Sequence, residues 1–403
     1  MFGLQNSGLD CGTKTGDNLP MTKRNFDFAV VGAGCFGAWT ARALLDAGHS
    51  VALIDAFGPA HSRASSGGES RVIRMGYGAD ELYTRWSMRS LVAWKKLNAR
   101  CGQTIFHETG MLWLTGHEDG YVSATQKTLE RAGVAHEKLS PSELEGKFPQ
   151  ISPDGIAWAL WEPGGGALMA RRSVQLLVDE SVKRGLNFRI ADVLPLSLRH
   201  PGHLRMRDGS ELSAGAYVFA CGPWLPKLFP DLLGARIFPT RQEVFFFAPP
   251  PGDTSFAPLA MPVWFHHPAL VYGIPDLENR GFKVSVDKHG PAFDPDTGSR
   301  VPSAEGLAIA RTYIAERFPK LKNATLTESR VCQYENTSNG DFIIDRHPAL
   351  DNVVIVGGGS GHGFKHGPAV GDYVCNMLTQ SNAVLESRFA LATKATTQAR
   401  SVY

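Results

Sequence analysis

The chain has 403 residues, of which 43% are hydrophobic, and this is enough to bury a large core in two domains or in one elaborated domain. Lysines and arginines number 41 against 39 aspartates and glutamates, without a basic block, so we expect no nucleic acid and no acidic membrane among the main partners. No apolar run reaches the roughly 18 residues that a membrane-spanning helix needs.

The N-terminal segment and the cysteines indicate where the protein works. Residues 1–21 lack a basic start, an apolar core and a small-residue cleavage site, so we expect a flexible leader, with Met21 as an alternative start. No two cysteines form a CxxC pair, which favours a reduced, cytoplasmic protein over a disulfide framework or a zinc site. The six cysteines are Cys11, Cys35, Cys101, Cys221, Cys332 and Cys375.

The first predicted elements are a strand and a glycine-rich turn. The apolar run 26–31 predicts a buried parallel strand. It leads into a G-x-G-x-x-G motif made by Gly32, Gly34 and Gly37. In a dinucleotide fold these glycines permit the turn, the approach of the backbone to a pyrophosphate, and close packing of helix on strand. The N-terminus of the next helix then offers free N–H groups and partial positive charge to the phosphates.

The helix and strand after the turn complete the motif. We expect Ala43, Leu44 and Ala47 on the apolar face of the helix, and Gly48 at its end. The strand "VALID" ends at Asp55, about 20 residues after the motif, where an acid accepts hydrogen bonds from an adenosine ribose. An acid here favours FAD or NAD over NADP, and the motif does not choose between those two.

The later elements place this motif in a larger mixed α/β protein. A polar, glycine-bearing connection at 58–77 is longer than a simple NAD domain needs. In chain order we then expect a helix at 80–100, strands at 104–116 and 155–163, a helix at 170–184, strands at 186–193 and 216–224, antiparallel strands within 236–290, and a final strand, glycine turn and helix at 352–378.

This order predicts a Rossmann-like nucleotide domain built from separated segments, with a smaller sheet-rich domain inserted between them. The nucleotide domain would take residues 22–85, 160–230 and 330–390. The second domain would take 86–159 and 231–329 and carry the substrate, and 391–403 would form a tail. A pocket at the junction is the expected active site.

The stretch "IVGGGSGHGFKHGPAV" at 355–370 resembles a phosphate loop but does not meet its requirements. In a P-loop the lysine follows a glycine directly and a Ser or Thr hydroxyl comes next. Here Phe364 separates Gly363 from Lys365, and His366 stands where the hydroxyl belongs.

A metal site is also not expected at this stretch. His362 and His366 have the spacing of two ligands on one helix face, but the glycines beside them and Pro368, at a helix start, indicate a loop. No carboxylate joins them locally. Two interpretations remain: the wall of a cofactor site, with backbone N–H groups and Lys365 facing the cofactor, or a glycine turn with an exposed lysine.

Four motifs together resemble a known family. They are "VVGAGCFG", "HSRASSGGESRVIRMGY", "GFKVSVD" with Lys283, and "CQYENTSNGDFIIDRHPALDNVVIVGGGSGHGFK" with Cys332 and Lys365. From about Asp27 to Leu378 the chain resembles the monomeric sarcosine oxidase and N-methyltryptophan oxidase branch of the flavin-dependent D-amino-acid-oxidase-like superfamily. The first motif is shared by many flavoproteins, whereas the fourth is specific.

The resemblance implies FAD, attached through Cys332 as an 8α-S-cysteinyl thioether. It implies that Lys283 lies above the flavin and promotes electron transfer to O₂, and that Arg71 packs near the flavin. Arg74 and Lys365 would bind the substrate carboxylate. The ordinary alternatives are an inert buried thiol for Cys332 and a lysine at a strand edge for Lys283.

The complete expected site follows from the motifs and the resemblance. Catalytic or substrate-binding residues are Lys283, Arg74, Lys365, Tyr77, Tyr272 and Asp287, where each tyrosine has a core residue as its alternative. Cofactor-binding residues are Gly32, Gly34, Cys35, Phe36, Gly37, Asp55, Ala56, His61, Ser65, Ser66, Arg71, Val72, Val193, Gly222, Trp224, Cys332, Ser360, Gly361, His362, Gly363, Phe364 and Lys365, with both His362 and His366 lining the pocket.

Two positions depart from the family. Asp287 and Gly67 stand where the sarcosine enzymes carry histidines, and a carboxylate with open space suggests a larger or more cationic amine. The implied reaction is oxidation of a secondary amine, an N-alkyl or cyclic amino acid, to an imine that hydrolyses, while O₂ becomes H₂O₂. Its partners would be the amine and O₂, and the protein would be a monomer. Alternatives are a flavin dehydrogenase with another electron acceptor, an NAD-linked dehydrogenase, and a non-catalytic binder.

Overall fold

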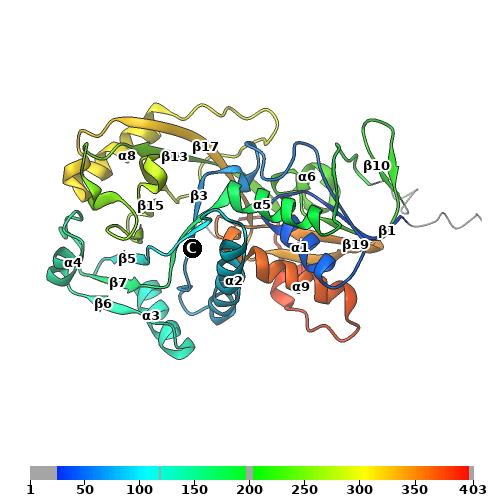
Figure 1. Cartoon of the computed structure of the whole chain (residues 1–403), viewed down its shortest axis with the longest axis horizontal. Coiled ribbons are helices and arrows are strands. Elements are labelled where there is room, and N and C mark those ends of the chain that lie inside the picture. Colours follow the sequence, from blue (N-terminus) through cyan, green and yellow to red (C-terminus); the bar gives the residue numbers. More distant parts are fainter. Residues whose placement is uncertain (1–24, 118, 197–202, 399–403) are drawn as a thin grey trace, which may run out of the picture.

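The computed structural model describes residues 25–117, 119–196 and 203–398. The expected leader, with Cys11, and the last five residues of the expected tail lie outside the described residues. Within the described part, two sheet-based halves lie side by side, and both the N-terminal motif and the last long helix belong to the same half (Figure 1). No helix of this part is both long and apolar enough to span a bilayer.

The N-terminal motif belongs to a six-stranded sheet with the order β18-β19-β12-β1-β2-β9. Its strands are β1 (Phe26–Val31), β2 (Val51–Asp55), β9 (Asn187–Ile190), β12 (Ala214–Phe219), β18 (Ile343–His347) and β19 (Leu350–Gly357). Neighbouring strands run parallel except for β18 and β19. Strands predicted in distant stretches of the chain therefore meet in one sheet, which confirms the Rossmann-like part of the predicted α/β fold.

Helices cover one face of this sheet and pack closely on each other. They are α1 (Cys35–Asp46), α5 (Ala170–Lys183) and α9 (Gly367–Thr379), with α2 (Glu81–Arg100) packed against α9. Glycines allow the close packing. A Cβ at Gly37 would lie 1.8 Å from the carbonyl oxygen of Gly32, and one at Gly371 would lie 2.5 Å from that of Trp39.

The predicted apolar face of α1 is wrong at one position. Leu44 is buried and Ala43 is partly buried, but Ala47 is exposed and forms the C-cap. The helix turns its first residues, including Phe36 and Trp39, toward the sheet and α9. Asp46, the last helical residue, and Ala47 are both exposed, so the apolar face of α1 ends before Ala47.

The opposite face of the six-stranded sheet is covered by short elements. They are the hairpin of β10 (Leu204–Arg205) and β11 (Glu211–Leu212), the 3₁₀ turn η2 (Gly222–Trp224), and the helices α6 (Leu225–Leu228) and α7 (Pro230–Leu233). Alternate strand residues point to the two faces, so Val30 and Leu53 meet the helices while Val31 and Ile54 meet these short elements.

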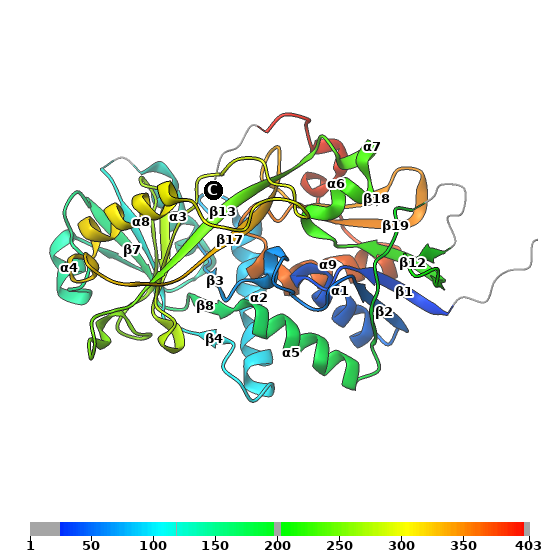
Figure 2. The same ribbon diagram turned by 90° about the horizontal axis from the view of Figure 1, so that it is seen from above.

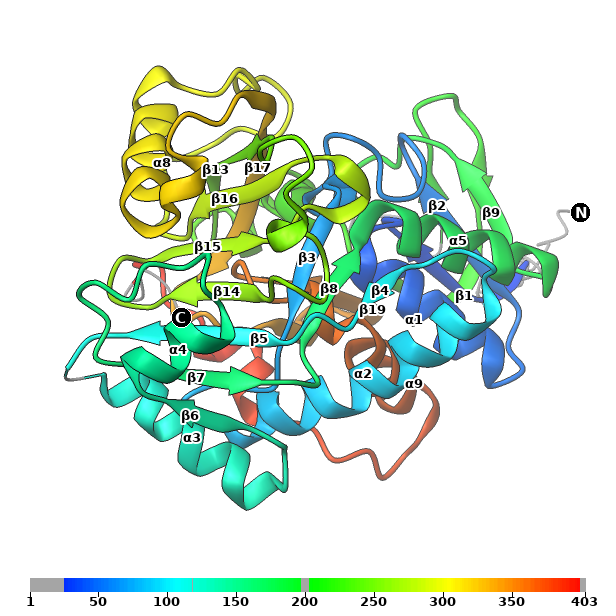
Figure 3. The same cartoon turned by 60° about the vertical axis from the view of Figure 1, so that its left-hand side comes forward.

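The other half is built on an eight-stranded sheet with the order β17-β13-β16-β15-β14-β5-β7-β6 (Figure 3). Its strands are β5 (Met111–Thr115), β6 (Glu137–Leu139), β7 (Trp158–Glu162), β13 (Ile237–Phe247), β14 (Val263–His266), β15 (Val271–Ile274), β16 (Phe282–Val286) and β17 (Leu326–Thr337). The antiparallel strands predicted within 236–290 are confirmed. Three helices of this half carry no sequence prediction: α3 (Gly120–Ala132), α4 (Pro141–Lys147) and α8 (Ala304–Arg317).

Two features connect the halves. A small sheet of β3 (Ser70–Ile73), β8 (Gly166–Met169) and β4 (Phe106–His107) lies between them. The long antiparallel pair β13 and β17 runs from the eight-stranded sheet toward the six-stranded one (Figure 2). Near the end of β17 the carbonyl oxygen of Glu335 accepts a hydrogen bond from the Ser360 N–H at 3.1 Å. The last residues of β17 therefore lie beside the glycine turn that follows β19.

Candidate active site

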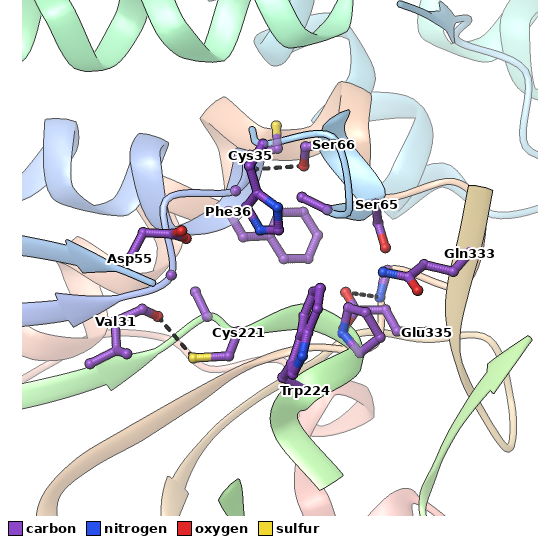
Figure 4. Close-up of a pocket in the computed structure, with 18 of the residues that line it drawn as sticks. Val31, Cys35, Phe36, Asp55, Ser65, Ser66, Cys221, Trp224, Gln333 and Glu335 are labelled. Atoms are coloured by element: carbon purple, nitrogen blue, oxygen red, sulfur yellow. Dashed lines mark hydrogen bonds between the residues drawn. The ribbon is translucent and has the colours of Figure 1, made fainter. Parts of the chain in front are cut away.

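A cavity of about 410 Å³ lies beside the carboxyl ends of β1, β2 and β12, where Rossmann-like sheets bind dinucleotides (Figure 4). Most residues predicted to bind the cofactor line it: Gly32, Gly34, Cys35, Phe36, Asp55, Ala56, His61, Ser65, Ser66, Arg71, Val193, Gly222, Trp224, Cys332, Ser360, Gly361, Gly363 and Phe364. The other four lie elsewhere. Gly37 packs against the turn at Gly32, whereas Val72, His362 and Lys365 line a second cavity.

The start of α1, where the sequence predicts the phosphates to bind, forms part of the wall of this cavity. Its N-cap, Gly34, supplies no side-chain hydrogen bond, and the N–H of Cys35 donates to the Ser66 hydroxyl at 3.0 Å. Gly32 has a φ of +103°, and a Cβ there would lie 2.4 Å from the carbonyl oxygen of Ala220. The backbone turn is therefore open only to glycine, and it presents a helix N-terminus to the cavity.

Asp55 holds the turns around the nucleotide site in place. One carboxylate oxygen accepts from the Ala33 N–H at 2.8 Å. The other accepts from the N–H groups of Phe57 at 2.8 Å and Gly58 at 3.0 Å. A carboxylate offers about four acceptor positions, so the side chain still has capacity for a ribose hydroxyl in the cavity that it lines.

Cys332 differs from the other thiols of the cavity. Burial raises the pKa of the Cys332 thiol, but the charges of Arg71 and Arg330 outweigh burial and leave the pKa below its ordinary value. A guanidinium nitrogen of Arg71 lies 3.3 Å from its Sγ. For Cys35 and Cys221, burial dominates and raises the pKa. The thiolate, the reactive form, is therefore favoured at Cys332 alone among these three.

Lys283 lies on β16 and is 2% exposed. Its ammonium group donates to the carbonyl oxygen of Ser70 at 3.0 Å and lies 5.9 Å from the ring centre of Tyr272. Burial and then the charge of Arg71 lower its pKa from 10.5 to about 7. The lysine is therefore a buried group whose charge changes near neutral pH, and not an exposed lysine at a strand edge.

A second cavity of about 90 Å³ adjoins the first. The two cavities share wall residues, which are Arg71, Cys332, Tyr334, Ser360, Gly361 and Phe364. The predicted residues Lys283, Arg74, Lys365, Tyr272 and Asp287 all line this smaller cavity. Sequence segments more than two hundred residues apart thus meet beside the expected ring end of the cofactor.

Two cations form one side of the smaller cavity. The ammonium group of Lys365, 4% exposed, donates to the Tyr77 hydroxyl at 2.8 Å and to the His362 carbonyl oxygen at 3.0 Å. Arg74 donates to the carbonyl oxygen of Gly76, and its guanidinium lies 4.3 Å from the ring centre of Tyr77. Burial and then the charge of Arg74 lower the pKa of Lys365 well below its ordinary value.

Tyr77 and His366 do not line the pocket as predicted. Tyr77 is buried behind Lys365 and Arg74, and its hydroxyl lies 2.8 Å from Nε2 of His366. His366 is fully buried behind Tyr77, and neither residue lines either cavity. Tyr77 therefore contacts the lysine from behind the cavity wall, and His366 contacts Tyr77 in turn.

The two departures from the family have different outcomes. Asp287 lines the smaller cavity, and it accepts from the Tyr334 hydroxyl at 2.8 Å. The open space expected at Gly67 does not exist, because a Cβ there would lie 2.0 Å from the carbonyl oxygen of His61. Gly67 lines neither cavity, and backbone fills the place of the missing side chain.

Two residues in or behind the walls of these cavities, Tyr334 and Glu162, carry no prediction from the sequence. Tyr334 stands two residues after Cys332 on one strand, so the strand period of two could have identified it. Glu162, fully buried behind Arg74, accepts from Trp113 Nε1 at 2.7 Å and from the Met75 N–H at 2.9 Å. Burial raises the pKa of Glu162. No local sequence pattern distinguishes it from an acid at the end of a strand.

The described residues contain no cluster of three or more histidines, cysteines, aspartates or glutamates arranged to hold a metal ion. Pro368 falls in the first turn of α9, as predicted, and the glycine turn before it forms walls of both cavities. This arrangement supports the cofactor-wall interpretation of the stretch 355–370 over an exposed glycine turn.

Comparison with known proteins agrees with this geometry. The peroxisomal sarcosine oxidase of Homo sapiens is 31% identical over 360 residues, covering 86% of this chain and 90% of that protein. The monomeric sarcosine oxidase of Streptomyces avermitilis is 28% identical over 372 residues, covering 89% and 95% respectively. The structure of L-proline dehydrogenase from P. horikoshii superposes with a TM-score of 0.79 at 21% identity, covering 92% of this chain and 98% of that one.

The family model described as FAD dependent oxidoreductase (DAO) matches residues 27–377, which is nearly the whole described chain. Apart from Phe26, the first residue of β1, the matched range includes all six strands of the six-stranded sheet, and it includes the residues that line the cavity at the sheet's carboxyl edge. The protein belongs to the DAO family of FAD-dependent oxidoreductases.

Proposed function

We propose that this protein oxidises the C–N bond of a small secondary amine that carries a carboxylate, such as an N-alkyl or cyclic amino acid, and passes the electrons to O₂. The observation that carries the proposal is the smaller cavity, which places Lys365 and Arg74 next to the wall that it shares with the cofactor cavity. Two buried cations are suited to a carboxylate. The names of the sarcosine oxidases with which the chain aligns support the same substrate class.

In this reaction the amine loses a hydride equivalent from the carbon next to nitrogen and a proton from nitrogen, which gives an imine. Water adds to the imine and splits it into an amine and a carbonyl compound. O₂ takes up the two electrons and two protons to give H₂O₂. FAD, when bound, supplies the two-electron acceptor. The chain's own residues bind and orient the substrate, and Lys283 offers positive charge where O₂ is reduced.

The volume of the smaller cavity favours a small substrate. At about 90 Å³ it is well below the roughly 300 Å³ of pockets for drug-sized ligands. Together with the filled space at Gly67, this volume weakens the expectation of a larger amine. Asp287 keeps the expectation of a cationic substrate, because its carboxylate lies in the wall of the same cavity.

We also propose a domain division, an oligomeric state and a cellular location for this protein. We expect residues 22–85, 160–230 and 330–390 to form the FAD-binding domain, and residues 86–159 and 231–329 to form the substrate domain, except that α2 packs against α9 of the FAD-binding half. We also expect a monomer in the cytoplasm. The cysteines of the described chain are all free, which supports a reducing location.

The function is tested by measuring H₂O₂ release with a panel of N-methyl and cyclic amino acids, the matching primary amino acids, and the matching amines without a carboxylate. We expect release with the first group at rates above those of the other two. If an amine bleaches the flavin absorbance in air without peroxide release, the protein is a flavin dehydrogenase. If no amine of the panel bleaches it, the proposed substrate class is wrong.

The covalent attachment of FAD is tested by replacing Cys332. After acid precipitation, yellow colour should stay with the wild-type polypeptide and should pass into the supernatant for Cys332→Ala, because no other cavity thiol has a lowered pKa. Cys221→Ala is the matched control, since its thiol lines the same cavity, and it should keep the colour bound. Free FAD released from the wild-type protein would contradict the attachment.

A further inference from the structure

A buried carboxyl group without a counter-ion lies in the wall of the cofactor cavity. Glu335, on β17, is 8% exposed and points into the cavity near Trp224 (Figure 4). Its Oε1 accepts from the N–H of Gly359 at 3.2 Å. Its Oε2 is buried and has no hydrogen-bond partner among the described residues. A buried carboxylate oxygen without a hydrogen-bond partner carries an uncompensated desolvation cost, so this group is favoured as the neutral acid or needs a partner from a bound ligand.

Three glycines make the space around this carboxyl group. A Cβ at Gly359 would lie 3.3 Å from Oε1, and one at Gly222 or Gly357 would lie 3.5 Å from Oε2. The glycine turn after β19 therefore leaves room for Glu335 as well as for the cofactor. A Cβ at Gly359 would press on Oε1, whereas one at Gly222 or Gly357 would only be in ordinary van der Waals contact with Oε2.

The charged surroundings of Glu335 do not stabilise a carboxylate. In the described part of the chain Glu335 makes no ion pair. Burial raises the pKa of Glu335 from 4.5 to about 7, although the backbone N–H groups of Gly359 and Gly358 act in the opposite direction and lower it. The titratable group that faces it from the end of β12 is Cys221, whose thiol pKa is raised by burial and by the charges of Asp55 and Glu335. The neutral acid is therefore accessible near neutral pH.

The position of Glu335 along the cavity indicates which part of FAD it meets. The motifs of the sequence assign Asp55 to the adenosine end of the cavity and Cys332, three residues before Glu335 on the same strand, to the ring end. A Cβ at Gly222 would lie 3.5 Å from Oε2 of Glu335, and Gly222 closely follows Ala220, which packs against the turn at Gly32, so Glu335 lies between that turn and Cys332. The middle of FAD consists of a hydroxylated chain and two phosphates, which all present acceptor oxygens. A carboxylate beside the phosphates would be repelled, whereas a neutral acid can donate.

We propose that Glu335 binds FAD as a neutral acid, donating a hydrogen bond from its carboxyl group to a hydroxyl or phosphate oxygen in the middle of the cofactor, so that FAD binding takes up a proton. The inference rests on the cofactor of the family and not on the amine that is oxidised. It therefore stands or fails separately from the proposed function.

The sign of the pH dependence follows from linkage. FAD favours the protonated form, so the affinity is constant below a pH of about 7, the pKa of the free protein. Above that pH the acid must be reprotonated on binding, and the affinity falls by at most about tenfold per pH unit until the pKa of the complex is reached. Between pH 7 and pH 9 the loss is at most about a hundredfold.

The test uses the full chain in a Cys332→Ser background, which cannot form the thioether. FAD is titrated from pH 6 to pH 9 and its fluorescence quenching gives the affinity. In the parent the affinity should fall above pH 7. Glu335→Gln keeps a neutral donor, so its affinity for FAD should stay within about threefold of the parent's at pH 6. At higher pH its affinity should decrease much less than that of the parent. Glu328→Gln, on the same strand but ion-paired with Arg280, is the matched control and should keep the parent's pH dependence.

Either of two results would overturn the proposal. One is a Glu335→Gln variant with the same fall in affinity as the parent. The other is a variant that binds FAD more weakly than the parent at pH 9, because a carboxylate acceptor would then be the binding form. If Glu335→Gln fails to fold, calorimetry of the parent in buffers of different ionisation enthalpy decides. Close to one proton taken up per FAD at pH 8 supports the proposal, and no uptake refutes it.

Discussion

Replacing Lys283 by methionine should slow the reaction of the reduced enzyme with O₂ by about 10²–10³-fold and leave its reduction by the amine within a few-fold of wild type. Methionine keeps the length and apolar stem of the side chain and removes its charge. The ammonium group is buried in the wall of the smaller cavity, where a fixed charge stabilises developing superoxide more strongly than in water. Stopped-flow measurement of the two half-reactions, on protein normalised to its flavin absorbance, separates the rates.

The same lysine predicts a pH dependence of defined sign. Burial and the charge of Arg71 lower its pKa to about 7, so Lys283 is charged below that pH and neutral above it. The rate of reoxidation by O₂ should therefore fall as the pH rises through 7, and Lys283→Met should lack this step. Lys394→Met is the matched control. Lys394 is also buried, and burial lowers its pKa to about 8, but it lines neither cavity.

If Lys283→Met slowed both half-reactions equally, Lys283 would be a structural lysine that shapes the pocket. If Lys394→Met reproduced the loss of O₂ reactivity, the effect would come from general destabilisation. The expected result is a selective loss at Lys283 and wild-type kinetics at Lys394.

The sequence predicted what local patterns determine. The strand, glycine turn, helix and acid of the N-terminal motif are contiguous, and the structure shows a steric requirement for glycine at Gly32 and Gly37. The mixed α/β fold follows from the same patterns and is confirmed. Periodicity was less informative at the edges of elements. The apolar periodicity predicts that Ala47 lies on the buried face of α1, but the helix ends at Asp46.

The depth of each residue in the site could not be predicted, because tertiary packing sets it. Tyr77 and Lys365 are 288 positions apart in the chain, and their hydrogen bond forms only after β3 and the glycine turn meet. Tyr77 stands three residues after Arg74, and this proximity in the sequence predicts a place in the pocket wall. In the structure Tyr77 lies behind that wall. Glu335 was missed for the same reason, since only the glycine turn that folds over it reveals a buried, unpaired carboxyl group.

Replacing Lys365 by methionine should raise KM for a carboxylate-bearing amine by about 10- to 150-fold, the value of a charged hydrogen bond of roughly 1.5–3 kcal/mol. The effect on kcat should be smaller, because the carboxylate contact is present in both the bound substrate and the transition state. Steady-state kinetics with an N-methyl amino acid measures the change. The matching N-methyl amine without a carboxylate is the control, and its KM should change little.

A pH series sharpens this last test. Burial and the charge of Arg74 lower the pKa of Lys365 well below its ordinary value, so this lysine loses its proton at a lower pH than an exposed lysine does. A bound carboxylate favours the charged form, so KM of the wild type should rise with pH as the lysine loses its proton, and Lys365→Met should not show this rise. Equal losses for the two substrates would mean that Lys365 acts by supporting Tyr77 and His362, its hydrogen-bond partners, and that Arg74 alone binds the carboxylate.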